Sequence, residues 1–147
     1  MSSYTTQIIQ FIIMALVGIL FNPMNMLAYK VSDLYVSLTL VYGGLLMASN
    51  MIWSHEIIHY MSMGHFNPSL FGIGIVLSIF ITIVCLRKQL LVTDNQWLRR
   101  MISHHSTALT TSHIIYNRTN DATVKQLAKD IIDTQEKEIA QMKSMLT

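Results

Sequence analysis

Three long apolar stretches, at about residues 8–27, 34–53 and 70–86, are separated by short polar segments in the first two thirds of the chain. A helix that crosses a bilayer needs about 20 mostly apolar residues, and each stretch comes close to that length. From residue 93 onward the pattern changes, and apolar residues recur at the spacing of an amphipathic helix. The sequence therefore predicts an all-α fold, with a transmembrane anchor of three helices at 1–92 and a soluble C-terminal antiparallel helical hairpin at 93–147.

The hairpin is predicted from two amphipathic patterns separated by a polar break at residues 117–121. Thr93 and Gln96 have capping-box spacing at its start, and Thr119, Asn120 or Asp121 can cap the second helix. A short connection makes two helices antiparallel neighbours, so positions equally far from the turn face each other. The apolar positions of the second helix are Val124, Leu127, Ala128, Ile131, Ile132, Ile139 and Met142.

A helical hairpin on its own buries too little apolar surface to be stable in water. We therefore expect the pair of helices at 93–147 to pack on something else. The sequence leaves three alternatives open: the membrane helices, a second copy of the chain, or another protein.

Charge is sparse and unevenly distributed, which gives the predicted anchor an orientation. Charged residues make up 12% of the chain, against roughly 25% in soluble domains. With three spans, one side of the membrane holds Lys30, Arg87, Lys88, Arg99 and Arg100, and the other holds no Lys or Arg. The positive-inside rule then places the C-terminal domain on the cytoplasmic side.

The net charge of +2 is too small to indicate a nucleic acid partner. Cys85 is the only cysteine, so no intrachain disulfide forms.

Candidate metal ligands lie in the hairpin. His104 and His105 face the level of Gln135, and Met101 faces Glu138. Together with Met142 these side chains suit copper(I), whereas imidazole with carboxylate suits zinc or copper(II). Adjacent residues on a helix diverge by about 100°, which favours a structural alternative. In that alternative one histidine hydrogen-bonds to Gln135 or Glu138 across the hairpin and the other is exposed.

A second histidine cluster follows the second apolar stretch. His55-Glu56-Ile-Ile-His59 matches the H-E-x-x-H pattern, in which two histidines on one helix face bind zinc and the glutamate acts as general base. His65 follows at the spacing of a third ligand. One alternative is a metal site without catalysis. The other is the end of a helix at the membrane interface, where Trp53, Tyr60 and the histidines lie at headgroup level.

Small residues mark predicted helix contacts. Gly43, Gly44 and Ala48 form a strip in the second apolar stretch, and Gly72 and Gly74 lie in the third. Such strips let two helices approach closely in a membrane, within the chain or between copies.

Residues 97–146 resemble the domain of unknown function family 305. The resemblance is carried by Met101-Ile-x-His104-His105-Ser and by the spacing of Leu127, Gln135, Glu138 and Met142. The upstream part resembles the membrane-anchored branch of that family, with three spans before a His-His hairpin. The resemblance implies a ferritin-like helical fold and makes His104, His105, Glu138 and Met142 the positions of interest, since some soluble relatives bind copper. Ser103 stands where the family usually has proline.

Three functions follow as hypotheses. The first is a non-enzymatic integral membrane protein whose hairpin docks on a partner or assembles. In a large DNA virus this would be a virion membrane component touching capsid proteins, because similar sequences occur in such viruses. The second is a copper-binding membrane protein that uses the hairpin site. The third is a membrane zinc metallopeptidase at His55, Glu56 and His59.

Overall fold

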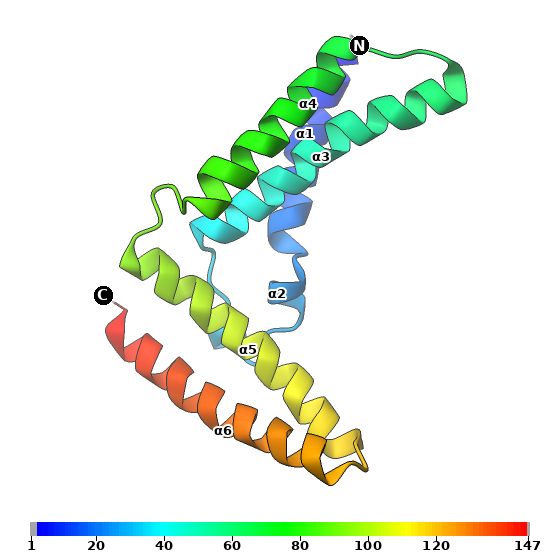
Figure 1. The fold of residues 1–147 in the computed structure, drawn as a ribbon. Helices are drawn as coiled ribbons and strands as arrows, with labels where there is room; N and C mark the ends of the chain where they lie inside the picture. The colour runs from blue at the N-terminus through cyan, green and yellow to red at the C-terminus, as the bar shows by residue number, and fades with distance from the viewer. Residues whose placement is uncertain (1–2, 147) are drawn as a thin grey trace. The chain divides into compact units, whose positions relative to one another are not determined.

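A computed structural model describes residues 3–146, and these contain helices and no strand, which confirms the all-α prediction (Figure 1). The elements in chain order are α1 (Ser3–Leu20), α2 (Pro23–Met26), η1 (Val31–Asp33), α3 (Leu38–Met63), α4 (Pro68–Phe80), η2 (Ile81–Arg87), α5 (Asp94–Arg118) and α6 (Ala122–Met145). The chain forms two compact units. We call α1, α3, α4 and η2 the apolar unit, and α5, α6 and the segment Pro23–Ser37 the hairpin unit.

In the apolar unit, α3 packs against both α1 and α4, and small residues make these contacts close. A Cβ atom added at Gly44 would lie 2.6 Å from a side-chain carbon of Ile19 on α1. One added at Gly74 on α4 would lie 2.8 Å from the backbone nitrogen of Trp53 on α3. The predicted small-residue contacts are therefore confirmed at these two glycines. At Gly43 and Gly72 the added atom would meet nothing within 4 Å of the described chain, so a contact of these two glycines between copies stays a prediction.

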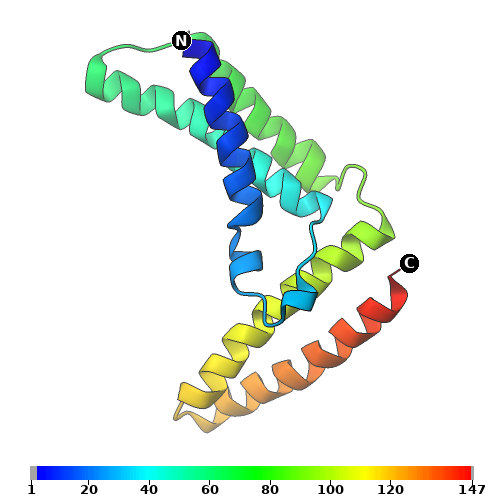
Figure 2. The same cartoon turned by 180° about the vertical axis from the view of Figure 1, so that it is seen from behind.

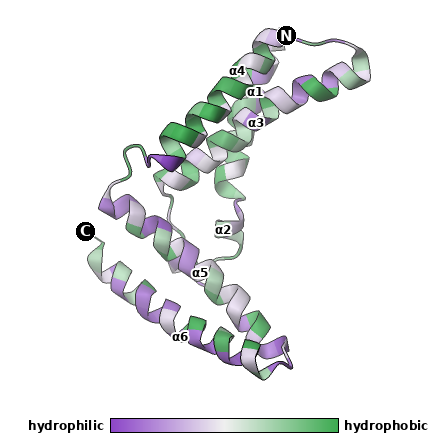
Figure 3. Ribbon diagram, in the orientation of Figure 1, coloured by the Kyte–Doolittle hydropathy of each residue, from purple (hydrophilic) through white to green (hydrophobic). Residues whose placement is uncertain are grey.

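Two helices of the apolar unit are long and apolar enough to cross a membrane, not the three that the sequence analysis predicted. They are Tyr4–Met26 and Pro68–Arg87. The stretch predicted at 34–53 falls in α3, which continues to Met63 and carries Asn50, His55 and Glu56 in its second half. These polar residues lower its mean hydropathy, which is why α3 does not qualify. Figure 3 shows hydrophobic residues along α1 and α4 and a mixture of both kinds on α5 and α6.

Most of the apolar surface of these two helices is uncovered. Only 17% and 22% of the residues in their most apolar windows are buried. Ile12 is 53% exposed and Val76 is 65% exposed. Contiguous apolar surface of this kind is unfavourable in water and marks a surface that meets lipid or another protein.

The hairpin unit is built on α5 and α6, which pack side by side along their length. The Asp121 side chain caps α6 by accepting hydrogen bonds from the backbone N–H of Thr123 at 2.8 Å and of Val124 at 3.1 Å. Thr93 occupies the N-cap of α5, as predicted, although its side chain makes no capping hydrogen bond. The buried core of the pair is Leu98, Ile102, Leu109, Ile132, Ile139 and Met142.

The segment Pro23–Ser37 belongs to the hairpin unit, although the sequence analysis placed it in an anchor at 1–92. It includes α2 and η1 and contacts α5 (Figure 2). The apolar unit ends at Leu91, and the hairpin unit is made from two separate pieces of the chain. Part of the cover that the hairpin requires is therefore supplied by the connection between α1 and α3.

Candidate functional site

A buried carboxylate joins the segment Pro23–Ser37 to both helices of the hairpin. Asp33 is 1% exposed. Its Oδ1 atom lies 2.5 Å from Nζ of Lys143 on α6, and its Oδ2 atom accepts a 2.7 Å hydrogen bond from the hydroxyl of Ser106 on α5. The hydroxyl of Ser103 donates to the backbone carbonyl of Asp33 at 2.9 Å. One acidic residue thus connects three segments that lie far apart in the sequence.

The surroundings of Asp33 favour its charged form. Burial alone would raise the pKa of this carboxyl, because an ion loses hydration in the interior. The hydrogen bonds from Lys143 and Ser106 and the positive charge of Lys143 outweigh that effect, and the pKa of Asp33 lies below its ordinary value. Asp33 is therefore an ionised structural group at neutral pH.

Backbone and ring contacts hold the same segment on α5. The N–H of Tyr29 donates to the Ser106 hydroxyl at 2.9 Å, and the N–H of Tyr35 donates to the Ser103 hydroxyl at 3.3 Å. The ring of Tyr29 stacks on His113, with 4.7 Å between ring centroids. The sequence analysis did not identify this cluster. Its only local signal is a pair of serines three residues apart on an otherwise apolar face of α5.

The histidine pair of the hairpin separates as the structural alternative predicted. His105 lies across the hairpin from Glu138, with Nε2 2.8 Å from Oε2. Its Nδ1 lies 2.8 Å from the backbone carbonyl of Met101. Each ring nitrogen of His105 therefore lies within hydrogen-bond distance of an acceptor oxygen. His104 is exposed.

The other predicted ligands of the hairpin do not gather around His105. Met142 is 8% exposed and belongs to the apolar core, and Gln135 has a buried Oε1 atom with no hydrogen-bond partner. Partial burial lowers the pKa of His104, and the charges of Arg100 and His105 add to the effect. Of the set proposed for copper, the structure brings together His105 and Glu138. A copper site here stays a prediction.

The second histidine cluster lines one cavity at the C-terminal end of α3. The cavity has a volume of about 360 Å³ and is lined by His55, Glu56, His59, His65, Phe66 and Asn67. The rings of His55 and His59 are stacked with 5.8 Å between centroids, and those of His59 and His65 are 6.1 Å apart. As the side chains lie, no group of three or more His, Cys, Asp or Glu residues within 3–146 is arranged to hold a metal ion.

Glu56 is the acid of this cluster and is 3% exposed. Its Oε2 accepts a 3.0 Å hydrogen bond from the backbone N–H of Asn67, which precedes α4. Its Oε1 lies 3.7 Å from Nδ1 of His55. Within the described residues, no Lys or Arg forms an ion pair with this carboxylate.

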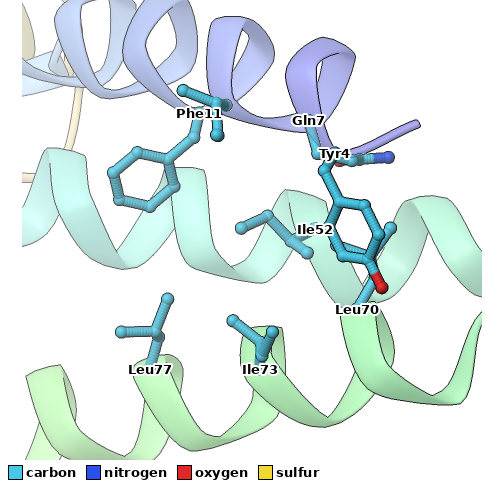
Figure 4. Close-up of a pocket in the computed structure, with 8 residues that line it drawn as sticks. Tyr4, Gln7, Phe11, Ile52, Leu70, Ile73 and Leu77 are labelled. Carbon is cyan, nitrogen blue, oxygen red and sulfur yellow. The ribbon is translucent and has the colours of Figure 1, made fainter. Parts of the chain in front are cut away.

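An apolar cavity of about 330 Å³ lies between α1, α3 and α4 in the same unit (Figure 4). Gln7 lines it and is 4% exposed. The Gln7 Nε2 atom is 2.9 Å from Nδ1 of His55, whereas its Oε1 is buried and has no hydrogen-bond partner. Gln7 therefore connects the apolar cavity to the histidine cluster. The sequence analysis noted no role for it, because a single glutamine in an apolar stretch gives no signal of its partner.

Two comparisons with known proteins give matches. The family model described as "Domain of unknown function (DUF305)" matches residues 90–147, which contain α5 and α6. An uncharacterized protein of Acanthamoeba polyphaga mimivirus is 38% identical over 142 residues, which cover 96% of this chain and 91% of the relative. No solved structure matches, so the ferritin-like arrangement implied by the resemblance stays a prediction. The membrane-anchored branch likewise stays a prediction. The resemblance to the family itself is confirmed, and the chain belongs to the family described as Domain of unknown function (DUF305).

Proposed function

We propose that this chain is a non-enzymatic membrane protein whose α5–α6 hairpin assembles with a second copy of itself. The similarity to a mimivirus protein supports a viral setting. In that setting the protein would be a structural component of a virion membrane, with its hairpin on the side that faces the capsid.

The membrane part of the proposal rests on the exposed apolar helices. Burying the surface of α1 and of α4 with η2 in lipid removes the unfavourable contact with water, and helices satisfy their own backbone hydrogen bonds there. Lys30 and Arg99 both belong to the hairpin unit, which is polar and carries most of the charge. The excess of Lys and Arg near the ends of the apolar helices favours the cytoplasmic side for this unit.

The observation that carries the assembly part is an uncovered apolar row on α6. Val124 is 40% exposed, Leu127 is 58% exposed and Ile131 is half-buried. These positions follow one another by three and four residues, so they share one face of the helix. Neither α5 nor the segment Pro23–Ser37 covers the row fully. Another surface is needed to remove it from water.

A second copy fits this row better than an unrelated surface because the flanking charges are self-complementary. Asp130 and Lys137 are exposed and seven residues apart, which places them on the same side of α6. A two-fold axis between them brings Asp130 of one copy against Lys137 of the second copy, and the same pair forms twice. In this register Leu127 of one copy faces Ala140 of the second copy. Copies held in one membrane also meet at a high effective concentration.

Charge exchange in the full chain, reconstituted in nanodiscs or detergent, tests the proposal. We expect a dimer by analytical ultracentrifugation that Leu127→Glu disrupts. Asp130→Lys and Lys137→Asp should each weaken it, by roughly 3- to 10-fold for two exposed ion pairs. The double variant Asp130→Lys/Lys137→Asp should restore it.

Lys129→Glu is the matched control, because this exposed residue lies about 200° round the helix from Leu127. It should leave the dimer unchanged. A wild-type chain that stays monomeric at all concentrations would overturn self-assembly and would leave a capsid protein as the partner of the row. A dimer that the double exchange fails to restore would also overturn the proposed interface.

A further inference from the structure

We infer that His55 and His59, completed by His65, form a binding site for a divalent transition-metal ion of the Zn²⁺ type at the end of α3. This site lies in the apolar unit and is separate from the hairpin. It concerns binding of the ion and no chemical reaction.

The first argument is the placement of the two rings. Residues four apart on a helix lie on one face, and the rings of His55 and His59 are parallel within 14° and 5.8 Å apart. Zinc binds imidazole nitrogen at about 2.0–2.1 Å, so two rings on one ion have centroids roughly 5–6 Å apart. The two histidines therefore meet the spacing that a shared ion requires without a change in the backbone of α3.

The second argument is that hydrogen bonds already fix the inner nitrogens of both rings. Nδ1 of His59 lies 3.1 Å from the backbone carbonyl of His65. When Nδ1 donates this bond, the lone pair of Nε2 is free for a metal. Histidine ligands commonly have their second nitrogen held by a carbonyl or carboxylate in this way.

The Nδ1 atom of His55 can be held in the same way, by the side chain of Gln7. The Gln7 amide faces Nδ1 of His55 at 2.9 Å, and its own oxygen is buried without a partner. If the amide turns over, Oε1 accepts a hydrogen bond from Nδ1–H, and Nε2 of His55 becomes a free donor to the ion. Binding would thus use an acceptor atom that is otherwise unsatisfied in the interior.

The third argument is charge. Glu56 is 3% exposed, and the ion pair that involves it is the one with His55, at 3.7 Å. A buried carboxylate without a cation is unfavourable, since desolvation is not compensated. A divalent ion bound by the adjacent histidines would supply positive charge beside it. Glu56 also holds the turn before α4 through the N–H of Asn67, which keeps His65 close to the cavity.

His65 can complete the site by a rotation of its exposed side chain, which leaves its backbone carbonyl on Nδ1 of His59. It follows Gly64, whose φ of +72° is readily adopted by glycine, and both residues are exposed. The His65 ring lies 6.1 Å from that of His59. Because the three side chains do not converge as they lie, the third ligand must rotate onto the ion when it binds.

Titration of the full chain in detergent with Zn²⁺, and with Co²⁺ for its visible absorption spectrum, tests the inference. We expect one ion per chain and a Co²⁺ spectrum typical of tetrahedral coordination. His59→Ala should lower the affinity by about 100-fold or more, and Gln7→Leu, which removes a positioning residue, by about 10-fold. Circular dichroism will show whether the variants keep their helices.

His104→Ala and His105→Ala are the matched controls and should leave binding unchanged, since they lie in the hairpin unit. A wild-type chain that binds no Zn²⁺ at micromolar concentration would overturn the inference. Binding that survives His59→Ala but is lost in His105→Ala would also overturn it, and would instead place the ion at the hairpin.

Discussion

The two units of the molecule each contain a buried carboxylate, and the two are held in different ways. Asp33 in the hairpin unit is 1% exposed, and Glu56 in the apolar unit is 3% exposed. Asp33 has a lysine, a serine hydroxyl and a lowered pKa. Glu56 has one backbone N–H and a histidine at 3.7 Å. The charge of Asp33 is compensated by Lys143 and Ser106 of the same chain. Glu56 instead lines a cavity that has room for a cation from solution.

The difference follows from where the partners lie in the sequence. Lys143 and Ser106 reach Asp33 from two other helices, so its charge stabilises the tertiary arrangement of the hairpin unit. The partners of Glu56 come from its own helix and the following turn. Loss of the first carboxylate should therefore disturb the fold, and loss of the second should disturb ligand binding.

The largest effect is expected for Asp33→Ala. It leaves Lys143 and Ser106 without their acceptor and should destabilise the hairpin unit by about 3 kcal/mol, as for other broken buried pairs. Hydrogen exchange of α5 and α6 amides in the full chain measures this. Asp133→Ala, at an exposed position of α6, is the control and should change protection little. Unchanged exchange in Asp33→Ala would show that the carboxylate does not hold the unit together.

Acid should produce a smaller, graded version of the same effect. Because the pKa of Asp33 is lowered in the folded chain, the stability that it contributes is present above its unfolded pKa of about 3.9. That stability is lost as the pH falls through the lower pKa that Asp33 has in the folded chain. Protection of α5 and α6 should therefore drop below about pH 4 in the wild type. In Asp33→Asn, this part of the pH dependence should be absent.

Removal of the cross-hairpin bond should have a moderate effect. His105→Ala breaks the 2.8 Å contact with Glu138, which is half-exposed, and we expect a loss of about 1 kcal/mol. Exchange of the amides near Glu138 should rise, while the segment Pro23–Ser37 stays protected. A copper site at this position would instead appear as metal lost from the purified protein in the variant.

The smallest effect on stability is expected for Glu56→Gln, and it sharpens the comparison because, unlike Asp33→Ala, it should cost little or no stability. The amide oxygen still accepts from Asn67 N–H, and the substitution removes a buried carboxyl group that forms no ion pair with a Lys or Arg of residues 3–146. Without added metal, thermal unfolding should stay within about 1 kcal/mol of the wild type or shift toward greater stability. In the presence of Zn²⁺ the variant should bind more weakly. A large loss of stability would show that Glu56 is structural like Asp33.

Helices and their ends were predictable where the signal is local. The periodic apolar residues of α5 and α6 were predicted, because helix spacing depends on residues within a few positions. A cap at Thr119, Asn120 or Asp121 was also predicted, and the structure has it at Asp121. The span predicted at 34–53 was wrong, because α3 begins at Leu38 and continues to Met63 with polar residues in its second half. The histidines at 55 and 59 were also paired by spacing alone.

What the sequence by itself determined is the class of the molecule: apolar helices first, an amphipathic hairpin last, and histidine pairs whose spacing sets which rings share a face. Only the tertiary structure decided that the segment Pro23–Ser37 belongs to the hairpin, that Asp33 meets Lys143, and that Gln7 meets His55. These contacts join residues separated by 48 to 110 positions. No periodic pattern encodes them, because they depend on how whole helices pack.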